Sequence, residues 1–115
     1  MAKLECSIKG NFSDFLSALD AAVMNGSMSA SYEDGSSFQS NGVFCATRVY
    51  ERYSYFGGNR VSLNITLFGT EEEFFLSAIT AGGSQAVFFK INTVGEESFL
   101  DCVRDFVEQY QRENA

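Results

Sequence analysis

The sequence predicts a two-layer α+β domain with the order β-α-β(4–5)-α, in which two helices pack on one face of an antiparallel sheet. Two segments repeat apolar residues at helical spacing, whereas the other periodic segments alternate apolar and polar residues as strands do. Short glycine-containing turns join successive strands, and such turns require antiparallel pairing. Each helix has a single apolar stripe, so both helices need the same sheet face and the other face stays open.

Composition indicates one globular domain, residues 1–115. The apolar fraction of 45% and the 12 phenylalanines argue against disorder and supply a core. A net charge of −7 disfavours nucleic acid and anionic membranes as partners, because both repel an acidic surface. No apolar run approaches the ~18 residues of a membrane span, and the N-terminus lacks the apolar stretch of a signal peptide.

The chain contains no histidine, which removes the commonest general base, the Ser-His and Cys-His nucleophile pairs and nearly all zinc sites. The chain has three cysteines, Cys6, Cys45 and Cys102. The number is odd, and no two of them have the spacing of metal ligands. We interpret them as small reduced thiols, which favours a cytoplasmic protein. The sequence therefore predicts no catalytic residue, no metal and no cofactor.

The first strand is predicted at residues 3–9, where alternate apolar side chains share one face. Asn11 is a good N-cap for a helix at about 12–24, and Asn25-Gly26 is a left-handed stop signal. A short strand around residues 28–32 follows. The segment 34–42 is rich in Gly, Ser and Asn and is predicted to be a loop.

A hairpin is predicted from strands at about 43–56 and 60–68, joined by the turn Gly57-Gly58-Asn59. Two further strands are predicted at 74–81 and 86–91, and a C-terminal helix at about 96–112. The apolar faces of the second hairpin strand and of this helix predict one shared core. Its predicted members are Val61, Leu63, Ile65, Leu67, Phe99, Val103 and Phe106.

Three runs carry a resemblance to a known family: RVYERY at 48–53, GGNRVSL at 57–63 and GGSQAVFFK at 82–90. They resemble a family of small bacterial proteins described only as a domain of unknown function. The resemblance implies no reaction, ligand or catalytic residue. The element order also resembles half of the TATA-binding-protein-like fold and, more loosely, the helix-grip folds that enclose apolar ligands, although a fold does not fix a function.

The open sheet face is the predicted functional surface. Arg48, Tyr50 and Arg52 interrupt the alternation of one strand, and they are expected to share a face with the polar row Ser62, Asn64 and Thr66 of the next. Arginine and tyrosine suit an anionic or flat ligand, and they are also enriched in subunit contacts. The predicted ligand or partner face consists of Arg48, Tyr50, Arg52, Asn64 and Lys90. A plain solvated surface remains the alternative.

Glu51 is the nearest approach to a catalytic group. It is either a partly buried carboxylate with a raised pKa or an acid paired to an arginine, and the second reading is favoured. The expected function is thus a non-enzymatic cytoplasmic binding or interaction module that assembles as a homodimer through its open sheet face. The alternative is a carrier of a small apolar or anionic ligand, held between the sheet and the C-terminal helix.

Overall fold

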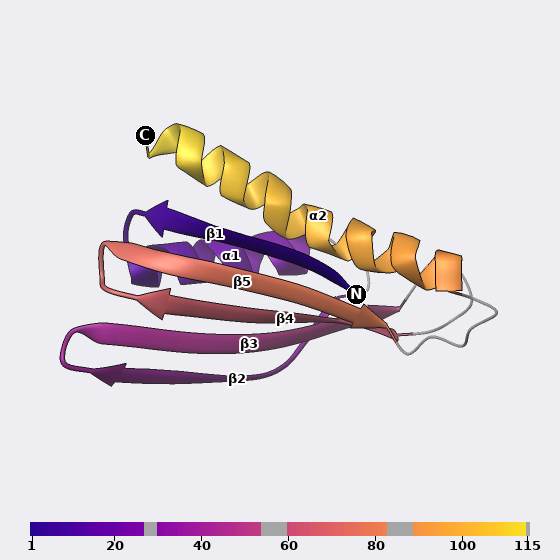
Figure 1. Ribbon diagram of the computed structural model, residues 1–115, viewed down its shortest axis with the longest axis horizontal. Coiled ribbons are helices and arrows are strands. Elements are labelled where there is room, and N and C mark those ends of the chain that lie inside the picture. The colour runs from indigo at the N-terminus through magenta and orange to yellow at the C-terminus, as the bar shows by residue number, and fades with distance from the viewer. Residues whose placement is uncertain (27–29, 54–59, 83–88, 115) are drawn as a thin grey trace.

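The computed structural model describes residues 1–26, 30–53, 60–82 and 89–114, and for residues 89–95 the backbone alone. Across this part of the chain it shows a five-stranded antiparallel sheet of order β1-β5-β4-β3-β2 with two helices (Figure 1). The predicted α+β arrangement is confirmed. Its elements are β1 (Ala2–Lys9), α1 (Phe12–Gly26), β2 (Ser31–Ser40), β3 (Val43–Tyr53), β4 (Arg60–Gly69), β5 (Glu73–Gly82) and α2 (Phe89–Glu113).

The N-terminal end of α1 is set by the predicted cap. The Asn11 side-chain oxygen accepts a hydrogen bond from the backbone N–H of Asp14 at 2.9 Å, which is the N-cap geometry. The acidic side chain of Asp14 lies in the first turn, where it faces the positive end of the helix dipole. The helix runs through Gly26, past the predicted end near residue 24, and neither Asn25 nor Gly26 has the positive φ of the predicted left-handed stop signal.

Most of the segment 34–42 is a strand rather than the predicted loop, and only residues 41 and 42 form a turn. β2 begins at Ser31 and extends to Ser40, whereas residues 28 and 29 of the predicted short strand lie outside the described residues. Asn41 and Gly42 then turn the chain into β3 with φ angles of 51° and 80°. Positive φ at both central residues is the geometry of the tight hairpin turns that Asn-Gly favours.

The C-terminal part also differs from the prediction. The predicted strand at 86–91 is wrong for residues 89–91, because these residues belong to α2. Residues 86–88 lie outside the residues that the structure describes. The helix therefore begins at Phe89 rather than near Glu96. The turn at 57–59 and the end of the predicted strand 43–56 likewise lie outside the described residues.

One face of the sheet is buried beneath both helices. Val61, Leu63, Ile65 and Leu67 alternate along β4 and are all 0–1% exposed. Phe99 and Val103 of α2 lie in the same core, while Phe106 is partly buried against it. The predicted core is confirmed, with Phe106 at its edge.

The two helices cover the sheet unevenly. α2 contacts β1, β4 and β5, and in Figure 1 β2 forms the sheet edge farthest from it. α1 packs beside α2 and reaches β3, because the Phe12 ring contacts that of Phe44 at a centroid distance of 5.3 Å. The same ring contacts Phe74 of β5 at 5.4 Å. The helix-side surface of β2 consequently has less cover than the rest of that face.

Candidate functional site

The predicted binding residues do not share one face. In the β3–β4 register Arg48 pairs with Ile65, Tyr50 with Leu63, and Arg52 with Val61. Directly paired residues point to the same side of a sheet, so all three arginine and tyrosine positions lie on the helix-covered face. The expectation that they share the open face with Ser62, Asn64 and Thr66 is wrong. That polar row pairs with Glu51, Val49 and Thr47.

Tyr50 is a core residue with a polar end. Its side chain is 0% exposed, and its hydroxyl donates a hydrogen bond to Asp20 Oδ1 of α1 at 2.7 Å. Burial, followed by this hydrogen bond and by the negative charge of Asp20, raises the pKa of Tyr50 well above its usual range. This hydrogen bond links α1 to β3 through the hydroxyl group of Tyr50.

The other predicted residues are dispersed. The Arg52 guanidinium lies over the ring of Phe99, 4.7 Å from its centroid, and burial lowers its pKa. Asn64 is on the open face and donates to Ser62 Oγ and to the Ile79 carbonyl oxygen, both at 3.3 Å. Lys90 belongs to α2, but its side chain lies outside the described residues. The structure therefore brings Arg48 and Tyr50 together and separates both from Asn64.

The open face carries an aromatic row that the sequence analysis missed. It crosses four strands through directly paired residues, namely Phe38, Cys45, Phe68 and Phe75. The exposed fractions of the three rings are 70%, 52% and 40%. The alternation itself contains the signal, because Phe68 follows the inward Leu67 and Phe75 follows the inward Phe74.

Small and charged side chains surround the aromatic row. The next row along the strands bears short polar groups, namely Ser36, Thr47, Thr66 and Ser77. Charged residues lie toward the margins, with Lys3, Glu5 and Lys9 on β1 and Asp34 on β2. Glu51 forms an ion pair with Arg60 at 2.9 Å, as the favoured reading of this acid predicted.

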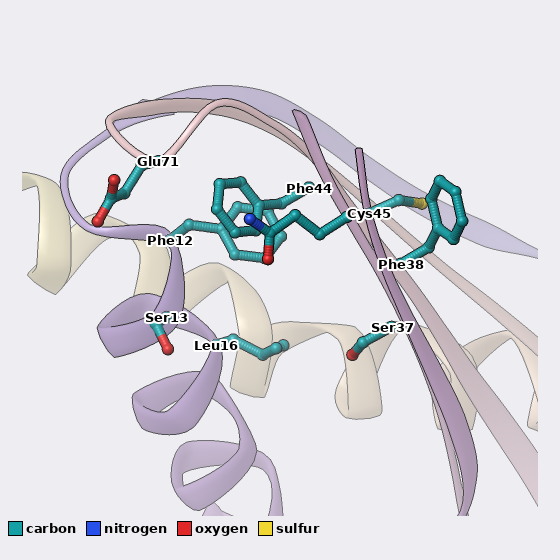
Figure 2. A pocket seen from close by; sticks show the side chains of 9 residues that line it. Phe12, Ser13, Leu16, Ser37, Phe38, Phe44, Cys45 and Glu71 are labelled. Carbon is teal, nitrogen blue, oxygen red and sulfur yellow. The ribbon is translucent and has the colours of Figure 1, made fainter. Parts of the chain in front are cut away.

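A groove runs along α1 on the covered face, between that helix and the β2–β3 hairpin; we call it the α1 groove. Its first section has a volume of about 360 Å³ and is floored by Phe12, Leu16 and Phe44. Ser37 and Gln39 of β2 line one side. Figure 2 shows the side chains of Phe38 and Cys45 on the far side of the strands, away from Phe12 and Phe44.

The second section of the α1 groove is polar. It has a volume of about 510 Å³, shares Leu16 with the first section, and adds Ser17, Asp20, Met24, Tyr32 and Arg48. Tyr32 and Arg48 converge over Gly35: a Cβ there would lie 2.5 Å from the Tyr32 hydroxyl oxygen and 2.8 Å from Arg48 Cδ. Glycine is therefore required where these two side chains meet.

Within the described residues, no group of three or more Cys, Asp or Glu side chains is arranged to hold a metal ion. No helix in that part of the chain combines the length and apolar character needed to cross a bilayer. The three cysteines are all free thiols.

Comparison with known families matches residues 1–111 to a family of unknown function, DUF6054. The chain belongs to this family. The membership confirms the predicted resemblance to a family described only as a domain of unknown function, and it assigns no activity. Among curated proteins, no match was found.

Proposed function

We propose that this DUF6054 protein is a non-enzymatic interaction module that assembles as a homodimer through its open sheet face. The supporting observation is the aromatic row, three rings exposed by 40–70% on consecutive or near-consecutive strands. Contiguous exposed apolar surface on a soluble domain marks an interaction site more often than idle surface. The row lies near the sheet end formed by the β2–β3 and β4–β5 turns, and short polar side chains flank it, with charged residues on the edge strands. Aromatic side chains bordered by polar groups are typical of protein interfaces.

A second copy of the chain fits this face by symmetry. We place a two-fold axis between the two open faces, parallel to the central strand β4. This axis sets β1 of one copy opposite β2 of the other, β5 opposite β3, and β4 opposite β4. Phe68 then meets its own counterpart, and Cys45 meets Phe75. The same operation brings Lys3 of β1 opposite Asp34 of β2, because these residues occupy the same row at opposite edges.

The available area is sufficient for a dimer. Five strands spaced about 4.8 Å apart, each with eight residues rising about 3.3 Å, give a face of roughly 630 Å². Stable interfaces bury about 600–1,000 Å² on each partner. The open face therefore lies at the lower end of that range, and we expect the dimer to dissociate on dilution.

The proposal includes the bacterial and cytoplasmic setting expected from the sequence. The three free thiols and the absence of histidine support a non-catalytic protein of a reducing compartment. In this view the protein acts by presenting its assembled surface, and no reaction is assigned to it.

Light scattering across a concentration series tests the assembly. The wild-type protein should approach twice the 12.7 kDa mass of one chain, and Phe68→Ser combined with Phe75→Ser should return it to one. Tyr32→Ser is the matched control, because this ring is 49% exposed but lies on the opposite face. If the wild-type protein is still a monomer at a chain concentration of about 100 μM, the proposal is wrong. A dimer with a dissociation constant above this value would be too weak to count as specific assembly.

A charge exchange tests the symmetry. Lys3→Asp and Asp34→Lys should each weaken dimerisation, because each places like charges opposite one another. The double variant should recover it. If the double variant is as weak as either single change, the two-fold axis parallel to β4 is wrong.

A further inference from the structure

We propose that the α1 groove binds a small zwitterion, an α-amino acid with an apolar side chain. Arg48 and Tyr32 would hold the carboxylate, Asp20 the ammonium group, and the section around Phe12 and Phe44 the apolar side chain. The site lies on the helix-covered side of the sheet and the aromatic row on the open side, so the proposal is independent of dimer formation.

Arg48 presents a cation with unused donors. Its Nη1 donates to the carbonyl oxygens of Ser36 and Thr47 at 3.0 Å and 2.7 Å, and its Nη2 donates to Ser37 Oγ at 3.1 Å. These bonds hold the guanidinium in place. A guanidinium has five N–H donors, and no carboxylate of the described residues pairs with this one.

Tyr32 completes the carboxylate site. Its hydroxyl and the Arg48 side chain approach the same point above Gly35. The ring itself is fixed by an edge-on contact with Tyr50, with a centroid distance of 5.8 Å. The Arg48 atom at that point is Cδ, one bond from the guanidinium. A phenol donor and a guanidinium on the same side of a groove can bind a carboxylate through charge-assisted hydrogen bonds.

Asp20 supplies the opposite charge. Its Oδ1 accepts the Tyr50 hydroxyl, and its second oxygen has no hydrogen-bond partner among the described residues. Asp20 is half-buried and lines the same section of the groove as Arg48, yet the two side chains form no ion pair with each other. Both charges consequently retain bonding capacity toward a third group.

Two unlike charges in one section favour a zwitterion over a simple ion. A monocarboxylate would satisfy Arg48 but place a negative charge near Asp20, and an amine would meet the converse repulsion from Arg48. An α-amino acid carries both groups on one carbon and satisfies both side chains. The adjoining section is floored by Phe12, Leu16 and Phe44, and Glu71 lies at its margin. Its floor favours an apolar side chain, and Glu71 disfavours an acidic one.

The size of the groove agrees with such a ligand. The apolar section alone has a volume of about 360 Å³, which lies in the range of small-molecule sites, about 300–1,000 Å³. Ser13, Ser37 and Gln39 at its margin leave it open to solvent on one side. We therefore expect weak, reversible binding rather than permanent retention.

Calorimetric titration with three matched probes tests the proposal: L-phenylalanine, 3-phenylpropionate, which lacks the amine, and phenethylamine, which lacks the carboxylate. L-phenylalanine should bind, and each analogue should bind at least about tenfold more weakly, as expected for loss of one charge-assisted contact. Equal binding of L-phenylalanine and 3-phenylpropionate would overturn the zwitterion assignment. Absence of binding by L-phenylalanine at about 10 mM would overturn the site.

Variants locate the binding. Asp20→Asn keeps an acceptor for Tyr50 and removes the charge, and Arg48→Met removes the guanidinium; each should weaken L-phenylalanine binding by about tenfold or more. Tyr32→Phe is a third variant that keeps the Arg48 bonds to β2, in case Arg48→Met does not fold. Arg104→Met, on α2 and outside the groove, is the control. Unchanged binding in folded Asp20→Asn and Tyr32→Phe proteins would contradict the proposal.

Discussion

The neighbouring strands β3 and β4 present different side chains to the same helix-covered face. β4 contributes an uninterrupted apolar series, Val61, Leu63, Ile65 and Leu67, whose members are all buried. β3 contributes Ala46 and Tyr50, which are buried, but also Arg48 and Arg52, which are partly exposed. The two strands are paired along their whole length, so the difference cannot come from the sheet itself.

The helix layer explains the difference. The main contacts of α2 are with β1, β4 and β5, and α1 reaches β3 along one side, which leaves the α1 groove open toward the sheet edge. A long arginine side chain is tolerated there because its apolar stem packs inward while its charged end reaches polar atoms or solvent. The arginines on the helix-covered face of β3 thus lie where the helices cover the sheet incompletely.

The largest expected effect is on the fully covered strand. Leu63→Ala removes a 0% exposed side chain beneath the helices and should lower the free energy of unfolding by about 3–5 kcal/mol. Thr66→Ala, on the exposed side of the same strand, is the control and should change it by less than about 0.5 kcal/mol. Urea unfolding measures both. Similar values for the two would mean that the register of β4 is wrong.

Gly35→Ala probes the uncovered side. A Cβ would lie 2.8 Å from the Thr47 carbonyl oxygen, which is backbone and cannot move aside without disturbing the β2–β3 pairing. We expect a loss of about 1–3 kcal/mol, the usual cost of overpacking. Gly42→Ala is the informative comparison, because nothing lies within 4 Å of its Cβ and only the φ of +80° opposes it. A smaller loss for Gly35→Ala than for Gly42→Ala would contradict the close approach of Tyr32 and Arg48.

Tyr50→Phe removes the bond between α1 and β3 while keeping the ring. The loss should be about 1–2 kcal/mol at neutral pH, since Asp20 is only half-buried. Because the folded state raises the pKa of Tyr50, it holds the phenolic proton more tightly than the unfolded chain does. The stabilising contribution is therefore complete below pH ~10, the ordinary tyrosine value, and falls as the pH rises above it.

Denaturation from pH 7 to 11.5 measures this dependence. The wild type should lose stability above pH ~10 more steeply than Tyr50→Phe, so that the two curves converge. Parallel curves would show that the Tyr50 hydroxyl is not buried against Asp20.

The elements with one clear local pattern were predictable from the sequence. The alternation of β4 and the Asn11 cap of α1 each correspond to a single physical signal, and the structure agrees with both. β2 was missed because its Gly, Ser and Asp residues are typical of loops. The stronger signal was the Asn41-Gly42 turn, which predicts a hairpin when strands flank it.

The functional surface was less predictable, since it depends on register. On β3 both faces mix apolar and polar residues, so composition does not show which side the helices cover. Arg48, Tyr50 and Arg52 were therefore predicted on the wrong face. The α1 groove depends on where α1 lies over the sheet, which no local pattern encodes. The outward Phe68 and Phe75, in contrast, followed from the predicted alternation and could have been recognised.

The smallest expected effect concerns the cysteines. Cys6 lies on the covered side of β1 and Cys45 on the open side of β3, and β5 and β4 separate the two strands. Two intervening strands at about 4.8 Å spacing exceed the Cα separation of about 7 Å that a disulfide allows. Cys102 is also a free thiol. Reductant should therefore leave the melting temperature unchanged, and a drop of several degrees would reveal a disulfide.

Thiol labelling then separates the two faces of the sheet. Burial raises the pKa of Cys6 and of Cys102, and a thiol that is less ionised reacts more slowly. Cys45 lies in the aromatic row on the open face, so it should be labelled first in dilute, monomeric protein. In the proposed dimer it faces the Phe75 ring of the second copy, and its labelling should slow as the protein concentration rises while that of Cys6 stays constant. If the labelling rate of Cys45 does not depend on protein concentration, the aromatic row is not the contact surface. Any self-association seen by light scattering would then involve another surface of the molecule.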